Sequence, residues 1–210
     1  MIKLTIEDKT YNIPSNFDEL TLGHYCDIFY NLDDIADIED EDEKRKALIK
    51  KQSVIISRLL NENDDFSMEL PISVYTRILE ETNYIYDIER FNKQMNNEIE
   101  INDKKYTVKS ILKLTTRQYI DIDEILKDKG NKNRFCDVLS IMIQDDYQGN
   151  YKALSNEIAK IPSSKGLPLM LFFYHLNKQS QIHFQISSQL EVIQNHLQQK
   201  IEDFKKTTNG

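Results

Sequence analysis

Apolar and polar residues alternate near the start of the chain and again roughly 95 residues later. Leu4 to Ile13 carries apolar residues at alternate positions on both sides of the polar triplet Glu7-Asp8-Lys9. Ile99 to Val108 repeats this pattern around Asn102-Asp103-Lys104. An alternation of period two is typical of strands that bury one face, so each stretch predicts a small β-hairpin with a polar turn.

A helical spacing follows each hairpin. Thr21 is a good N-cap and precedes apolar residues spaced by three or four, and Thr115 precedes a second such run. Gln118 stands three residues after Thr115 and completes a capping-box pattern. The pattern predicts two equivalent helices, with the apolar stripes Leu22, Tyr25, Ile28, Phe29 and Leu32 in the first and Tyr119, Ile122 and Leu126 in the second.

Two further helices are predicted after each of these. A helix from about Asp42 to Leu60 becomes apolar in its second half, and the run Val138 to Ile143 does the same in the second copy. Leu70-Pro71 and Leu167-Pro168 then each introduce a third helix, because proline is tolerated in a first helical turn.

These elements form a tandem repeat, which defines a structural unit. The sequence therefore predicts units 1–95 and 96–178, each a β-hairpin plus three helices, in a mainly α-helical α+β fold. The two hairpins either pair into one four-stranded sheet or lie apart, where an exposed edge would accept a strand from a partner. The matched positions are Ile6/Ile101, Asp8/Asp103, Lys9/Lys104, Tyr11/Tyr106, Leu20/Leu114, Thr21/Thr115, Tyr25/Tyr119, Asp27/Asp121, Ile28/Ile122 and Asp64-Asp65-Phe66/Asp145-Asp146-Tyr147.

Two segments have no counterpart in the first copy. Tyr151 to Ile161 predicts a short inserted helix, followed by a flexible loop over Pro162 to Gly166. The segment 179–210 predicts a long amphipathic C-terminal helix that either folds back on the body or projects toward another subunit. Its apolar stripe is the predicted partner-binding surface, formed by Ile182, Ile186, Leu190, Ile193, Leu197, Ile201 and Phe204.

Charge and hydropathy narrow the class of partner. The net charge of −8 argues against a nucleic-acid partner, which needs clustered Lys and Arg. The basic clusters Lys44 to Lys51 and Lys127 to Arg134 are expected to neutralise neighbouring acids on solvated faces. The longest apolar run, Leu167 to Leu176, is far shorter than the roughly 20 residues of a membrane helix, and the N-terminus reads as a strand rather than a signal peptide.

The residues that usually carry chemistry form no catalytic or metal-binding pattern. The glycines are scattered, the histidines lack zinc spacing, and no cofactor, metal or catalytic residue is predicted, so the protein is expected not to be an enzyme. The acidic run Asp33 to Asp42 lacks the glycine and the final glutamate of an EF-hand and predicts an exposed linker. Cys26 and Cys136 are expected to be buried free thiols of a reducing compartment.

The motif Ile-x-Asp-Lys-x-Tyr, followed by Leu-Thr-x-x-x-Tyr at the start of a helix, resembles small structural and assembly proteins of tailed bacteriophages. The composition, rich in Lys, Asn and Ile, resembles phages of gut Bacteroidales, the crAss-like group. The resemblance implies a non-enzymatic virion protein, made in the host bacterial cytoplasm, that binds other phage structural proteins or further copies of itself in a ring. It would belong to the portal or head–tail junction, the tail barrel or the internal cargo. The alternative is a tail-assembly chaperone that is absent from the mature virion.

Overall fold

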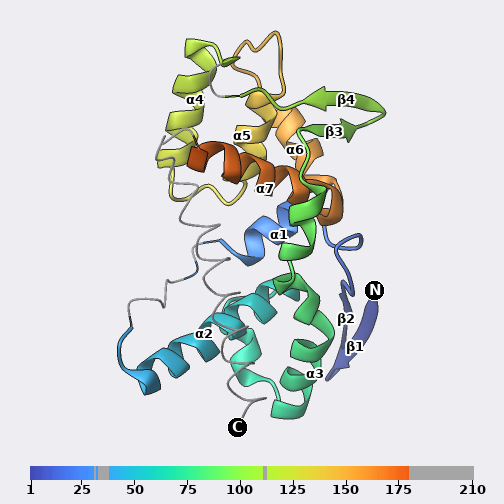
Figure 1. Cartoon of the computed structure of the whole chain (residues 1–210). Coiled ribbons are helices and arrows are strands. Elements are labelled where there is room, and N and C mark those ends of the chain that lie inside the picture. The colour runs from blue at the N-terminus through green and yellow to red at the C-terminus, as the bar shows by residue number, and fades with distance from the viewer. Residues whose placement is uncertain (31, 33–37, 111–112, 180–210) are drawn as a thin grey trace. The chain divides into compact units, whose positions relative to one another are not determined.

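The computed structural model describes residues 1–30, 32, 38–110 and 113–179. The protein is a mixed α+β protein, mainly helical, with two small antiparallel hairpins (Figure 1). The described chain divides into two compact units. The first unit contains Met1–Asn16 and Ile28–Asp87, and the second contains Phe17–Asp27 and the described chain from Ile88 onward.

The first unit opens with the predicted hairpin. Strand β1 (Ile2–Ile6) pairs antiparallel with β2 (Lys9–Ile13), so that Ile6 lies opposite Lys9 and Leu4 opposite Tyr11. Leu4, Tyr11 and Ile13 are buried, as the alternation predicts. In the turn Glu7 has a positive φ of 52°.

Helices complete the first unit. Helix α2 (Glu41–Leu59) begins behind Asp40, whose carboxylate caps it by accepting from the Glu43 N–H at 2.8 Å. Its acidic first turn suits the positive end of the helix dipole. Three further helical segments follow: the 3-10 helix η1 (Phe66–Glu69), α3 (Ile72–Thr82) and the 3-10 helix η2 (Asn83–Tyr86). The core of this unit is built from Leu4, Tyr11, Ile13, Ile28, Phe29, Ile55, Ile56, Leu59, Ile78, Ile85 and Tyr86.

The second unit carries the second hairpin and most of the remaining helices. Strand β3 (Glu98–Ile101) pairs with β4 (Lys104–Thr107), and these two strands form a sheet separate from β1–β2. The hairpins therefore do not pair with each other into one four-stranded sheet, which was one of the two predicted arrangements. The helices are the 3-10 helix η3 (Glu89–Gln94), α4 (Thr116–Lys127), α5 (Arg134–Met142), the predicted insertion α6 (Lys152–Lys160) and α7 (Ser163–Gln179).

Helix α1 (Leu22–Ile28) shows where the contacts depart from the predicted boundary at residue 95. Its segment, Phe17–Asp27, packs with the second unit although it follows the first hairpin in the chain. Leu20, Leu22 and Tyr25 are fully buried there. Gly23 allows the close approach, because a Cβ at this position would lie only 2.9 Å from the Ala159 Cβ.

The same segment also determines where α7 begins. The sequence predicted a flexible loop over Pro162 to Gly166 and a helix from Leu167-Pro168, but α7 begins at Ser163 and Pro168 lies inside it. The Ser163 N–H and hydroxyl both donate to the Leu20 carbonyl, at 2.7 and 2.8 Å, and fix the first turn of α7. Long-range hydrogen bonds thus override the local proline signal.

Candidate protein-binding site

The first hairpin contains a carboxylate-binding pair formed by Lys9 and Tyr11. The Lys9 Nζ forms an ion pair with Glu62, and the Tyr11 hydroxyl donates to Glu62 Oε1 at 2.9 Å. Lys9 Nζ also lies 4.9 Å from the centre of the Tyr11 ring. The hydrogen bonds from Lys9 and then Tyr11 hold the pKa of the Glu62 carboxyl below its usual value, and the same contact raises the pKa of Lys9.

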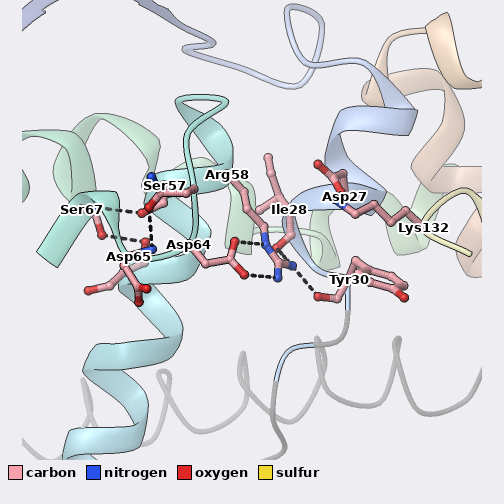
Figure 2. A network of polar contacts seen from close by, with 11 residues as sticks. Asp27, Ile28, Tyr30, Ser57, Arg58, Asp64, Asp65, Ser67 and Lys132 are labelled. Atoms are coloured by element: carbon pink, nitrogen blue, oxygen red, sulfur yellow. Dashed lines mark hydrogen bonds and ion pairs between the residues drawn. The ribbon is translucent and has the colours of Figure 1, made fainter. Parts of the chain in front are cut away.

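Glu62 is held in place by the end of α2. Asn61 adopts the left-handed conformation (φ 57°), and the N–H groups of Asn61 and Glu62 donate to the carbonyls of Arg58 and Ser57, each at 2.9 Å. This is a Schellman cap, which reverses the chain directly after the helix. Arg58 then donates from Nε and Nη2, along one edge of its guanidinium, to the two oxygens of Asp64 at 2.7 and 2.8 Å, and its Nη1 donates to the carbonyl of Tyr30 (Figure 2). The loop that carries Glu62 is therefore held by the cap hydrogen bonds at its start and by the Arg58–Asp64 pair after Glu62.

The second hairpin repeats the pair but not its partner. Lys104 and Tyr106 occupy the positions that match Lys9 and Tyr11, and Lys104 Nζ again lies 4.9 Å from the ring centre. The position that matches Glu62 is Ile143, since Asp64-Asp65-Phe66 aligns with Asp145-Asp146-Tyr147. Within the described chain no carboxylate bonds Lys104 or Tyr106. Among the described residues, the second pair therefore differs from the first in that no carboxylate satisfies its ammonium and hydroxyl groups.

A groove of about 890 Å³ runs beside this second pair. We call it the β4 groove; its walls are Lys104 to Ser110 along β4, Ile143 to Asp146 after α5, and single residues of α6 and α7. Successive residues of a strand point to opposite faces, so a groove lined by consecutive residues of β4 follows the edge of the strand. Four lysines and two aspartates line it: Lys104, Lys105, Lys109, Lys113, Asp145 and Asp146.

The backbone of β4 offers hydrogen bonds along this edge. Asn102 and Asp103 have φ values of 50° and 61°, as in a type I′ turn, which makes Ile101 and Lys104 the hydrogen-bonded pair that closes the hairpin. Pairs alternate along an antiparallel ladder, so the N–H and C=O groups of Lys105 and Thr107 point away from β3. Figure 1 shows the hairpin extending from the helices of its unit.

Hydrogen bonds and an ion pair hold the far wall of the groove in place. The Gln118 amide donates to the carbonyls of Ile141 and Gln144, at 2.8 and 3.0 Å, while its side-chain oxygen completes the predicted capping box with Thr115. Lys109 donates to the Gln144 carbonyl at 2.7 Å and pairs with Asp145 at 3.1 Å. Of the groove lysines, Lys109 is therefore committed to the wall, while Lys105 and Lys113 make no ion pair within the described residues.

Asp137 is buried in the second unit and lies at the centre of a polar cluster. Its carboxylate accepts from Ser155 at 2.6 Å, Asn131 at 2.7 Å and Lys152 at 2.8 Å. Both oxygens are occupied, so the cluster links α5 to α6 and offers no free group for chemistry. Nearby, burial and the bond to Asp121 raise the pKa of Tyr147 far above its usual value, so this phenol stays a neutral donor.

The predicted partner-binding stripe lies outside the described residues, from Ile182 to Phe204. Of the predicted acidic linker, 33–37 lie outside them as well, and Asp40 caps α2. In the second basic cluster Lys127 pairs with Asp123 at 2.5 Å and Lys132 with Asp27 at 2.7 Å, as predicted, whereas Arg134 is buried beside the Leu126 carbonyl at the end of α4.

Cys26 and Cys136 are free, as predicted; Cys136 is buried and Cys26 half-buried. The hydrogen bond to Cys26 and burial raise the pKa of the Cys136 thiol. In the described part of the chain, no three His, Cys, Asp or Glu side chains come together as metal ligands. No helix among those same residues is long and apolar enough to cross a membrane.

Sequence reasoning missed the lysines of the β4 groove. The signal was present in the difference between the copies: Lys105 stands where the first copy has Thr10, and Lys109 where it has Pro14. Lys113 lies in the connector that carries Asp18 and Glu19 in the first copy. Strand β4 of the second hairpin thus carries two lysines where β2 of the first carries one.

No protein-family model, no curated protein and no solved structure matches this chain.

Proposed function

We propose that the protein is a non-enzymatic component of a tailed-bacteriophage virion that acts by binding other proteins. The observation that carries the proposal is the β4 groove, in which a strand edge with outward backbone groups lies beside lysine side chains. A groove of this kind suits strand addition, in which backbone hydrogen bonds supply affinity and flanking side chains supply specificity.

The geometry favours a binding role over catalysis. The most buried acid of the second unit, Asp137, has both oxygens engaged by Ser155, Asn131 and Lys152 and holds two helices together. Catalytic acids instead present a free or weakly bonded group to a cleft. The β4 groove contributes unpaired ammonium groups and backbone donors, which recognise a partner chain without reacting with it.

The phage assignment is supported by the resemblance of the Ile-x-Asp-Lys-x-Tyr hairpin and the Leu-Thr-x-x-x-Tyr helix start to virion and assembly proteins. Both parts of the motif have the same structural basis in the two copies, because Lys and Tyr lie on one side of each hairpin and Thr21 and Thr115 each accept a backbone N–H at a helix start. The motif therefore describes a folded unit suited to assembly surfaces.

Mass spectrometry of purified particles of the encoding phage tests this proposal. A virion component is expected in a fixed number of copies per particle, at the head–tail junction, tail barrel or in the internal cargo. A protein that is present in infected cells but missing from purified particles would instead be a transient assembly factor such as a tail-assembly chaperone. Presence in neither particles nor assembly intermediates would refute a role in the virion and in its assembly.

A further inference from the structure

The first unit supplies an internal template for what the second hairpin recognises. Lys9 and Tyr11 bind one carboxylate oxygen of Glu62 from two directions, an ammonium and a phenol. Lys104 and Tyr106 present the same two groups with the same spacing between the ammonium and the ring. The chemistry that satisfies the first pair is therefore the chemistry that would satisfy the second.

The surroundings of the second pair indicate that this carboxylate belongs to an extended chain. The N–H and C=O groups of Lys105 and Thr107 point outward from β4 along the groove. A strand laid against them would gain backbone hydrogen bonds and place alternate side chains on the face of Lys104 and Tyr106. On the opposite face Lys105 lies across from Glu100 of β3, so the carboxylate of the partner segment is expected on the face of Lys104 and Tyr106.

The charge of the groove indicates the same kind of partner. Four lysines outnumber the two aspartates, and one of these aspartates is already paired with Lys109. The groove is therefore locally positive on a chain whose net charge is −8. An acidic partner segment is attracted by these lysines, whereas the net negative charge of the chain as a whole repels it, and this contrast adds to the specificity of docking.

We propose that the β4 groove binds an extended acidic segment of another protein by strand addition to β4, with one carboxylate of that segment held by Lys104 and Tyr106. This inference rests on the proposed protein-binding function and specifies the site and the partner chemistry. The bound carboxylate takes the place that Glu62 holds in the first unit.

A peptide fits this site better than a nucleic acid does. The outward N–H groups of Lys105 and Thr107 alternate with carbonyls, which accept hydrogen bonds from a peptide and repel phosphate oxygens. Asp145 and Asp146 also line the groove and would oppose a continuous phosphate backbone. Two aromatic rings line the groove, Tyr106 on β4 and Phe172 on α7, rather than a row of rings along one strand for base stacking.

The test uses the full chain and two labelled peptides, each eight residues long with an amidated C-terminus and a neutral fluorophore. One contains Thr and Val with two adjacent Glu residues; in the other, both Glu are replaced by Gln. Fluorescence anisotropy at low salt is expected to give a Kd at least about tenfold lower for the Glu peptide, with the difference shrinking as salt is added.

Three variants localise the binding. Lys104→Gln and Tyr106→Phe are expected to weaken binding of the Glu peptide and leave the Gln peptide unchanged. Lys9→Gln changes the matched lysine of the first hairpin, whose Glu62 is already bound, and is expected to leave both affinities unchanged. Circular dichroism confirms that each variant is folded, and Lys104 is exposed, so its replacement leaves the core intact.

Hydrogen exchange gives a second readout. The bound peptide is expected to slow exchange of the Lys105 and Thr107 amides, which point away from β3 in the free protein. Protection confined to β1–β2, or tighter binding of a single-stranded oligonucleotide that displaces the peptide, would overturn the proposal. So would concentration-dependent self-association that blocks the groove, because a second copy would then be its occupant.

The two levels of the proposal fail separately. Equal binding of both peptides with protection of Lys105 and Thr107 would leave strand addition standing and refute the role of the carboxylate. Binding of neither peptide would overturn the assignment of the groove altogether, while the role in the virion is still judged by the composition of purified particles.

Discussion

The two hairpins contain the same Lys-x-Tyr pair in opposite situations. In the first unit Glu62 closes the pair, and the Tyr11 ring packs 5.8 Å from Phe66 in a buried position. In the second unit Ile143 stands at the position of Glu62, and Lys104 and Tyr106 line an open groove. The same pair is thus bonded to a carboxylate of its own unit in the first hairpin and to no carboxylate of the described residues in the second, and Glu62 against Ile143 is the matched position that accounts for this difference.

Replacing the matched tyrosines by alanine should give the largest difference in stability between the two units. Tyr11→Ala removes a ring that is 7% exposed and contacts Phe66, so the free energy of unfolding of the first unit should fall by about 3 kcal/mol. Tyr106→Ala removes a half-buried ring at a groove and should cost less than about 1 kcal/mol. Native-state hydrogen exchange reports each unit separately. Equal losses would mean that both tyrosines serve the fold alike.

The helices that follow the hairpins differ in a similar way. Gly23 of α1 aligns with Arg117 of α4, and a Cβ at Gly23 would lie 2.9 Å from the Ala159 Cβ and 3.1 Å from its carbonyl oxygen. Arg117 is exposed, and its guanidinium lies over Gly149. Position 23 therefore faces backbone that cannot move easily, whereas position 117 faces solvent.

Gly23→Ala should lower the stability of the second unit by about 1 kcal/mol, because crowding of about 2 kcal/mol outweighs the helix propensity gained. Gly23→Val should cost more, since its side chain is larger. Arg117→Ala is the matched control and should change stability by less than about 0.5 kcal/mol. The free energy of unfolding of all three variants is measured by urea unfolding, with hydrogen exchange of the α6 amides as the report from the second unit. A Gly23→Val variant as stable as the wild type would rule out close packing of α1 on α6.

Local patterns were sufficient to predict the elements that depend on near neighbours. The alternation of Leu4 to Ile13 gave the first hairpin, and Thr115 with Gln118 gave the capping box, because each contact spans only a few residues. The insertion α6 was predicted for the same reason. The mainly α-helical α+β fold follows from these pieces.

Contacts between distant residues were not predictable. Ser163 donates to a carbonyl 143 positions earlier, and this bond draws Phe17–Asp27 into the second unit and starts α7 ahead of Pro168. The hydrogen bonds of Lys9 and Tyr11 to Glu62 join residues that are more than 50 positions apart. Glu62 and Ile143 occupy matching positions in the sequence, but the sequence does not show that Glu62 contacts Lys9 and Tyr11. The β4 groove could therefore be recognised only after the structure showed that contact and its absence in the second hairpin.

The smallest expected effect is a pH dependence that belongs to the first hairpin alone. The folded-state pKa of Glu62 is depressed, chiefly by the hydrogen bond from Lys9 and then by that from Tyr11. A depressed carboxyl pKa contributes stability that is fully present above the unfolded-state value, near 4.5, and is lost as the pH falls through the lower folded value. Amide protection factors in β1–β2, corrected for intrinsic exchange, should therefore decrease below pH 4.5.

Glu62→Gln tests the cause of this decrease. Gln keeps an oxygen that accepts from Tyr11 but carries no charge to attract Lys9, so protection of β1–β2 should be lower at neutral pH and nearly flat across the acid range. The β3–β4 hairpin is the internal control, because Ile143 replaces the carboxylate there and the variant leaves its protection unchanged. If Glu62→Gln retained the wild-type acid profile, another carboxylate would stabilise the first hairpin. The contrast between a closed and an open Lys-x-Tyr pair would then lose its physical basis.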